Sequence, residues 1–270
     1  MLGARDGLRH GPRFVTFATK PSRGRTEQRN RDLMHHSIKI GAVAALVAAG
    51  AAQGAFVNFV VTSTNVSNSG QNLVRYELFA RFNGATDTIL NAFNLRSAGT
   101  TTLNAADAGG FWHKDNSDYS GGILGQAYGT WAPQLTGGAT TNRPFDSFLL
   151  IGGNPLGTNT TNADPSWGAG AGWNQAQLPI FPNSELGWFN SNPPNNQGRV
   201  GVAPNTATDV KLGQFILSQG DTAPRFYSLT VGYNNGAGGS VVFGTGTFNL
   251  PAPGAIAVLG LAGLIGRRRR

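Results

Sequence analysis

The sequence of 270 residues has no cysteine and few charged side chains. The absence of cysteine excludes disulfide scaffolds, cysteine zinc sites, thiol catalysis and lipid anchors on a modified cysteine. Charged residues make up 13% of the chain, which is roughly half the usual quarter of a soluble domain. The 39 glycines and 14 prolines indicate many turns and argue against a helical bundle. A hydrophobic fraction of 40% is still enough to build a core.

Recognisable catalytic motifs are also missing from the body of the chain, residues 56–250. It has no Gly-x-Ser-x-Gly elbow, no His-Glu-x-x-His helix and no Gly-x-x-x-x-Gly-Lys loop. Its one histidine, His113, would have to serve any Ser-His-Asp triad, and we interpret it as a structural or surface residue. Nothing selects the pair of carboxylates, about 5–10 Å apart, that a glycosidase needs. We therefore predict a protein that is not an enzyme and has no cofactor.

One acidic segment is a candidate metal site. Asp115, Asn116, Ser117 and Asp118 place oxygen atoms close together, and such clusters can bind Ca²⁺. The segment lacks the spacing of an EF-hand loop, and its residue types are common turn formers. We favour a turn, keep Ca²⁺ binding as the alternative and predict no metal site.

The formal net charge of +8 is confined to the ends of the chain. Residues 1–33 carry eight basic and three acidic side chains, and the last four residues are arginines. The body, 56–250, holds eight basic and ten acidic residues, a net charge of −2. Positive charge that is limited to terminal segments indicates targeting signals. We therefore predict no nucleic-acid partner.

Residues 34–54 have the features of a secretory signal peptide. The apolar and small residues 40–52 form an unbroken run, within the ~7–15 residues of a signal-peptide core and short of the ~20 that span a bilayer. Ala52 and Gly54 place small residues at the two positions that signal peptidase reads, so we expect cleavage after Gly54. Cleavage after Ala52, with Gly50 as the other small residue, is the alternative.

Residues 1–33 mix arginine, glycine and polar residues without apolar periodicity, which is typical of disorder. Met34 stands directly before the export signal. We expect translation to begin at Met34 and interpret 1–33 as an over-extended gene start.

The last segment, 251–270, has three parts. Pro251-Ala252-Pro253 is a stiff break. Residues 254–266 are apolar or small and would form a helix about 20 Å long at ~1.5 Å per residue. Arg267, Arg268, Arg269 and Arg270 form a charged block that should stay on the cytoplasmic side of a membrane. In this order the three parts resemble the PEP-CTERM sorting signal, with Pro-Ala-Pro where that family has Pro-Glu-Pro.

The resemblance implies a protein of a Gram-negative bacterium that makes exopolysaccharide. An exosortase, a membrane cysteine protease, would recognise and remove the tail, with Pro251, Ala252, Pro253, Gly254 and the four arginines as the sorting residues. The helix 254–266 would lie in the inner membrane transiently, before release to the cell surface or extracellular matrix. A plain tail anchor is the alternative, because an apolar segment followed by arginines needs no protease to stay in a membrane.

The body, 55–250, has the pattern of an all-β domain. Short apolar stretches are separated by turn-forming clusters, and the strands are expected at 56–64, 73–82, 88–95, 147–151, 210–217, 226–233 and 240–250. Within 73–82, Tyr76, Leu78, Ala80 and Phe82 alternate with more polar neighbours, which indicates one buried side. Asn234-Asn235-Gly236 predicts a hairpin. We predict an antiparallel β-sandwich, with a jelly roll as one form of it, and long Gly/Asn-rich loops.

Four tryptophans lie in or beside Gly/Asn/Pro-rich loops: Trp131, Trp167, Trp173 and Trp188. On exposed loops they could stack on sugar rings, but packing that pins the loops onto the sandwich is the interpretation that we favour. The function that we expect is a structural or interaction role at the cell surface or in its exopolysaccharide matrix. A carbohydrate-binding module is the alternative, and a secreted hydrolase ranks third.

Overall fold

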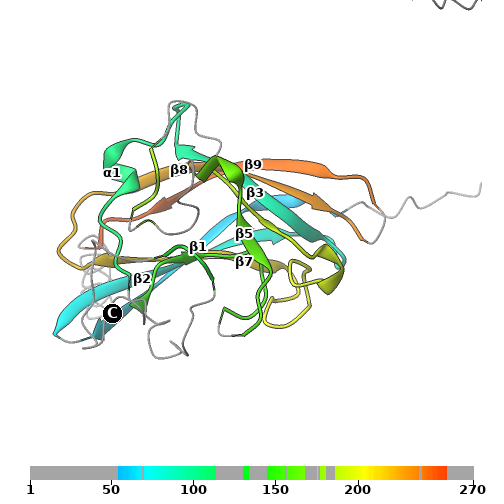
Figure 1. Cartoon of the computed structure of the whole chain (residues 1–270), viewed down its shortest axis with the longest axis horizontal. Helices are drawn as coiled ribbons and strands as arrows, with labels where there is room; N and C mark the ends of the chain where they lie inside the picture. Colours follow the sequence, from blue (N-terminus) through cyan, green and yellow to red (C-terminus); the bar gives the residue numbers. More distant parts are fainter. Residues whose placement is uncertain are drawn as a thin grey trace, which may run out of the picture. The chain divides into compact units, whose positions relative to one another are not determined.

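A computed structural model describes residues 54–68, 70–113, 130–133, 145–155, 157–167, 175, 177–180, 186–236 and 239–253 (Figure 1). The chain divides into two units, 1–48 and 49–270, and all of the described residues belong to the second. The predicted signal peptide up to Gln53, the segment 1–33 and the sorting residues from Gly254 onward lie outside them. Over the described ranges, no helix is long and apolar enough to cross a membrane.

Two antiparallel sheets form the described domain. The four-stranded sheet has the order β1-β2-β7-β4, with β1 (Phe56–Asn68), β2 (Gln71–Phe82), β7 (Asp209–Ser218) and β4 (Phe148–Leu149). The five-stranded sheet has the order β5-β6-β3-β8-β9, with β5 (Thr161–Ala163), β6 (Trp188–Asn190), β3 (Thr88–Ser97), β8 (Arg225–Asn234) and β9 (Val242–Leu250). Figure 1 shows β3, β8 and β9 in one layer and β1, β2 and β7 in the other. The predicted all-β sandwich is confirmed.

Helical structure in the described part is short. It includes α1 (Ala105–Ala108) and the 3-10 turns η3 (Pro165–Trp167) and η4 (Pro193–Asn195). Asn104 caps α1, because its side chain accepts a hydrogen bond from the backbone N–H of Asp107 at 2.8 Å. The helix therefore begins where a polar side chain can satisfy its first free donors, and it ends after one turn at Gly109.

All seven predicted strands are present, as β1, β2, β3, β4, β7, β8 and β9. The predicted alternation of β2 is confirmed, since Tyr76, Leu78, Ala80 and Phe82 are buried and the residues between them are only partly covered. The predicted hairpin joins β8 to β9, where Tyr233 lies opposite Val242 and Gly236 has a φ of 133°. The sequence did not predict β5 and β6, which are three residues each and lie within the Gly/Asn-rich loops.

Aromatic rings from both sheets form the centre of the core. The ring of Tyr227, on β8, lies 5.0 Å from Phe248 on β9 and 6.3 Å from Phe215 on β7, in stacked arrangements. The Tyr227 hydroxyl donates to the carbonyl oxygen of Asp107 at 2.6 Å. Because Phe215 belongs to one sheet and the other two rings to the second, these contacts join the layers.

The sandwich is narrow where β9 passes β1. A Cβ atom added at Gly244 would lie 2.6 Å from the Phe56 side chain, and one at Gly246 would lie 3.1 Å from Phe59. The rings of Phe56 and Phe59 are themselves 4.8 Å apart. Glycine in β9 therefore makes room for the aromatic side chains of β1.

We predict that Gly244→Val destabilises the domain by about 1–3 kcal/mol, because the added side chain overpacks this contact. Without the Phe56 contact the same change would stabilise a strand, since glycine in a strand costs about 0.5–1 kcal/mol. Thr247→Val, at an exposed position of the same strand, is the control and should change stability by less than about 0.5 kcal/mol. Urea denaturation measures both, and a Gly244→Val protein as stable as the wild type would contradict the packing described here.

Candidate functional site

The outer face of the four-stranded sheet carries cross-strand ion pairs. Arg81 donates two hydrogen bonds to the carboxylate of Asp209 at 2.7 and 2.8 Å, and these bonds hold the pKa of Asp209 below its usual value. Lys211 Nζ lies 2.6 Å from Glu77 Oε1. These four side chains thus have partners within the sheet, so they are poor candidates for binding a ligand, whereas the buried Nε of Arg75 has no hydrogen-bond partner among the described residues.

The outer face of the five-stranded sheet is different in chemistry. Strand register places Asn91 of β3 opposite Phe189 of β6 on one side and Gly232 of β8 on the other, and Gly232 lies opposite Phe243 of β9. The next row places Phe93, Thr230 and Thr245 side by side, and the two threonine hydroxyls are 2.8 Å apart. Aromatic rings, amides and hydroxyls therefore alternate across this sheet.

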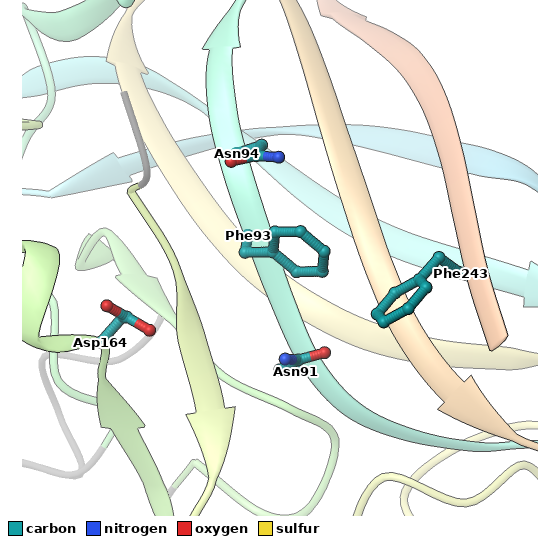
Figure 2. Close-up of a pocket in the computed structure, with 5 residues that line it drawn as sticks. All are labelled: Asn91, Phe93, Asn94, Asp164 and Phe243. Carbon is teal, nitrogen blue, oxygen red and sulfur yellow. The ribbon is translucent and has the colours of Figure 1, made fainter. Parts of the chain in front are cut away.

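A pocket of about 440 Å³ lies on this face, lined by Asn91, Phe93, Asn94, Asp164 and Phe243. Figure 2 shows Asn91, Phe93 and Asn94 along β3, with Phe243 to one side and Asp164 to the other. The rings of Phe93 and Phe243 meet edge to face, with centroids 5.8 Å apart and planes at 87°. Phe243 is 63% exposed, so its ring is available to a ligand. We call this pocket the sheet groove.

Two backbone features shape the sheet groove. A Cβ atom at Gly232 would lie 2.2 Å from Oδ1 of Asn91 and 3.3 Å from the ring of Phe243, so only glycine lets these side chains meet across β8. Asn94 has a φ of 57° and lies where the β3–β8 register shifts between Phe93 and Arg96. Asparagine tolerates this left-handed conformation, and the irregularity lets consecutive residues line the same groove.

The polar groups of the sheet groove are neutral amides and one carboxylate. Asn91 Oδ1 is buried and has no hydrogen-bond partner among the residues described. Asp164 follows β5, and its backbone is held because its N–H donates to the carbonyl of Gly187 at 2.9 Å and its carbonyl accepts from the N–H of Trp167 at 3.0 Å. Small-molecule sites usually combine aromatic side chains with a few placed polar groups, and the sheet groove contains both kinds, with three polar residues among its five.

Three of the four tryptophans proposed for sugar stacking lie in the interior, so that interpretation is corrected for them. Trp131 and Trp167 are 0% exposed and Trp188 is 1% exposed. A ring covered on both faces cannot stack on a ligand. Trp173 lies outside the described residues.

The buried tryptophans hold loops against the sheets, as the favoured interpretation predicted. Trp188 Nε1 donates to the carbonyl oxygen of Leu150 at 3.0 Å, which links β6 to the segment after β4. Trp167 Nε1 donates to the carbonyl of Gly187. The Trp131 ring packs edge to face on Phe111 at 5.2 Å. Each indole therefore serves packing rather than recognition.

His113 is buried beside an acidic residue that the sequence did not single out. Its Nδ1 lies 3.3 Å from Asp146 Oδ1, and both side chains are 0% exposed. The ring also meets Trp131 edge to face at 4.8 Å. The segment 115–118 lies outside the described residues. In the part of the chain that the structure covers, no three His, Asp or Glu residues come together as a metal site.

The predicted processing residues fall at the two edges of the described domain. Gly54 lies against Asp87 and directly precedes Ala55 and β1, whereas Ala52 is outside the described residues. Pro251, Ala252 and Pro253 follow β9. The sheet groove itself was not predicted, although its ring Phe243 falls on the outward side of the 240–250 strand. Pairing that ring with Asn91 and Asp164 requires the strand order.

Comparisons with known proteins identified no relative from which a function could be transferred. No protein-family model, no curated protein and no solved structure matches the chain.

Proposed function

We propose that the chain is an exported protein of the cell surface or extracellular matrix, sorted by an exosortase-type system, with a structural or interaction role. The observation that supports this proposal is the agreement between the edges of the sandwich and the two processing signals. Only Ala55 separates Gly54 from β1, and β9 ends at Leu250, directly before Pro251. Removal of both terminal signals would leave every described strand intact.

The junction with the sorting signal is part of the folded domain. The Tyr76 hydroxyl donates to the carbonyl oxygen of Pro251 at 2.5 Å, and Pro253 is buried. Burial of Tyr76 raises its pKa to about 12, so the hydroxyl keeps its proton, and its donor role, at physiological pH. The two prolines lack backbone donors and cannot continue the β9 ladder. The chain therefore leaves the β9 ladder at Pro251 while it is still held against the domain by the Tyr76 hydrogen bond.

We predict that alanine at both Pro251 and Pro253 leaves membrane insertion intact and blocks cleavage, because the junction can then become helical and conceal its backbone. Serine at all four terminal arginines should disturb both retention and processing, since those charges set the orientation. The control is Ala252→Glu, which creates the Pro-Glu-Pro of the family and should be processed.

The measurement is the intact mass of the exported protein in a host with its exosortase gene present or deleted. A C-terminus that still ends in four arginines when the gene is present would show that the tail is a simple anchor.

A second candidate function, carbohydrate binding, is favoured by the sheet groove. The exposed ring of Phe243 offers an apolar face for the C–H groups of a sugar, while Asn91, Asn94 and Asp164 offer hydrogen-bonding groups for its hydroxyls. The row of Thr230 and Thr245 continues the polar surface away from the ring. Because the amides and hydroxyls are uncharged, a hydroxyl-rich polymer fits this face better than a strongly charged one.

We predict that Phe243→Ala weakens binding to the host exopolysaccharide about tenfold, the equivalent of about 1.4 kcal/mol. Phe226→Ala is a matched control, because Phe226 is 51% exposed on the outer face of β8 but does not line the groove. Affinity electrophoresis in gels that contain the polysaccharide measures both variants. Tryptophan fluorescence is a poor readout here, since Trp131, Trp167 and Trp188 are buried. If the polysaccharide retards both variants equally, the sheet groove is not the binding site.

A further inference from the structure

The carboxylate of Asp87 is buried, and one of its two oxygens has no hydrogen-bond partner among the described residues. Its side chain is 0% exposed. Oδ2 accepts the backbone N–H of Gly84 at 3.0 Å, but Oδ1 has no hydrogen-bond partner among the described residues. Burial raises the pKa of Asp87, and the Gly84 hydrogen bond offsets part of that shift. A buried carboxylate without a cation is destabilising. A cationic group beside Oδ1 would therefore stabilise the fold.

The neighbouring basic and titratable side chains do not pair with the Asp87 carboxylate. Arg81 of β2 is engaged in its ion pair on the outer face. The hydroxyl of Tyr233, on β8, accepts a backbone N–H from β1 at 3.0 Å. Arg199 forms an isolated β-bridge with Thr88, the residue after Asp87. No charged side chain is among the causes of the shift in the pKa of Asp87.

What covers Oδ1 is the backbone of Gly54. A Cβ atom at Gly54 would lie 2.1 Å from Oδ1 and 2.3 Å from Oδ2 of Asp87, so only glycine can pass over the carboxylate. The next residue, Ala55, is held at both of its backbone groups. Its N–H donates to Asn83 Oδ1 at 2.6 Å, and its carbonyl accepts the N–H of Asn83 at 3.2 Å. The backbone nitrogen of Ala55 is therefore held in place, and Ala55 directly follows the glycine that covers the unpartnered oxygen.

We propose that the chain is cut between Gly54 and Ala55 and that Asp87 binds the α-ammonium group which the cut creates. This inference rests on the proposed function, because signal peptidase would make the cut. One water molecule hydrolyses the amide bond: its oxygen bonds to the Gly54 carbonyl carbon as the C–N bond breaks, and both of its protons end on the Ala55 nitrogen, which gives a carboxylate and an ammonium. Removal of Gly54 opens the space over Oδ1, and the ammonium has three N–H donors where the amide had one.

The geometry distinguishes this cut from the alternative after Ala52. With Gly54 retained in a chain that begins at Gln53, the glycine backbone would still cover Asp87, and no charge would form at Ala55. With Gly54 removed, one ammonium donor can keep the Asn83 contact while another turns to Asp87. Glycine at position 54 thus satisfies both the small-residue requirement of the peptidase and the steric requirement of the precursor.

Pairing would change the pKa of both groups in opposite directions. The pKa of Asp87 would fall below its unfolded value, so its stabilising contribution is present above that value and is lost as the pH falls through the folded pKa. The pKa of the Ala55 α-amine would rise above about 8, so its contribution is present below that pH and is lost as the pH rises through the folded pKa. The processed protein should therefore gain stability from the pair around neutral pH.

The first test is N-terminal sequencing of the exported protein purified from its host, which we expect to begin at Ala55. A protein that still carries 34–54 would overturn the proposed function together with this inference. An N-terminus at Gln53 would leave export standing and overturn the inference alone.

The second test is the rate at which acetic anhydride modifies the α-amine of Ala55 at pH 7, followed by mass spectrometry. If pairing raises the pKa by about one unit, the uncharged, reactive amine is about tenfold rarer in the wild type than in Asp87→Asn. The control is Asp221→Asn, which removes the carboxylate that pairs with Arg225 and should react at the wild-type rate. Equal rates in the wild type and Asp87→Asn would overturn the inference.

A third measurement needs no variant. In the wild-type protein alone, the pH of half-maximal α-amine modification should be about one unit higher in the folded state than in concentrated urea. If the two values coincide, the α-ammonium has no carboxylate partner, and the inference fails even where Asp87→Asn does not fold.

Discussion

The mutual packing of the Tyr227, Phe215 and Phe248 rings, with centroids 5.0 to 6.4 Å apart, is the contact on which the rest of the structure depends. The chain has no cysteine and therefore no disulfide between its sheets. The two layers are held by apolar packing, in which these three rings connect β7 with β8 and β9. Trp131, Trp167 and Trp188 extend the same core under the long loops. Because the inner faces provide cohesion, the outer faces are free to differ, one with ion pairs and the other with the sheet groove.

The sequence predicted the sheets well because their strands alternate. In β2, each apolar residue from Tyr76 to Phe82 falls on the inner side, which a period of two reveals without a structure. The tryptophans were harder, since a Gly/Asn-rich neighbourhood does not tell whether an indole points inward. The sheet groove and the Asp87 site could not be predicted. The groove residues come from three separate strands or their ends, namely Phe243, Asn91 and Asp164. Asp87 contacts Gly54 only because β1 pairs with β2.

Gly244, Gly232 and Gly54 share one structural role, which is to let a neighbouring side chain approach the backbone closely. Gly244 admits the Phe56 ring, Gly232 lets Asn91 approach Phe243, and Gly54 passes over Asp87. None of these three positions has a positive φ, so the reason for glycine is the absence of a Cβ atom and not backbone freedom. The high glycine content of this protein therefore reflects close side-chain contacts as well as turns.

The position of Phe243 on β9 has a mechanical consequence. The same strand ends at Leu250, where the segment with the sorting prolines begins. A pulling force between a polymer held at Phe243 and a tether beyond Pro251 would run along one strand. The covalent backbone of β9 would carry this force, so the β8–β9 hydrogen bonds from Tyr233–Val242 to Arg225–Leu250 would stay unloaded. The aromatic core, and with it the remainder of the sandwich, would lie outside that load path.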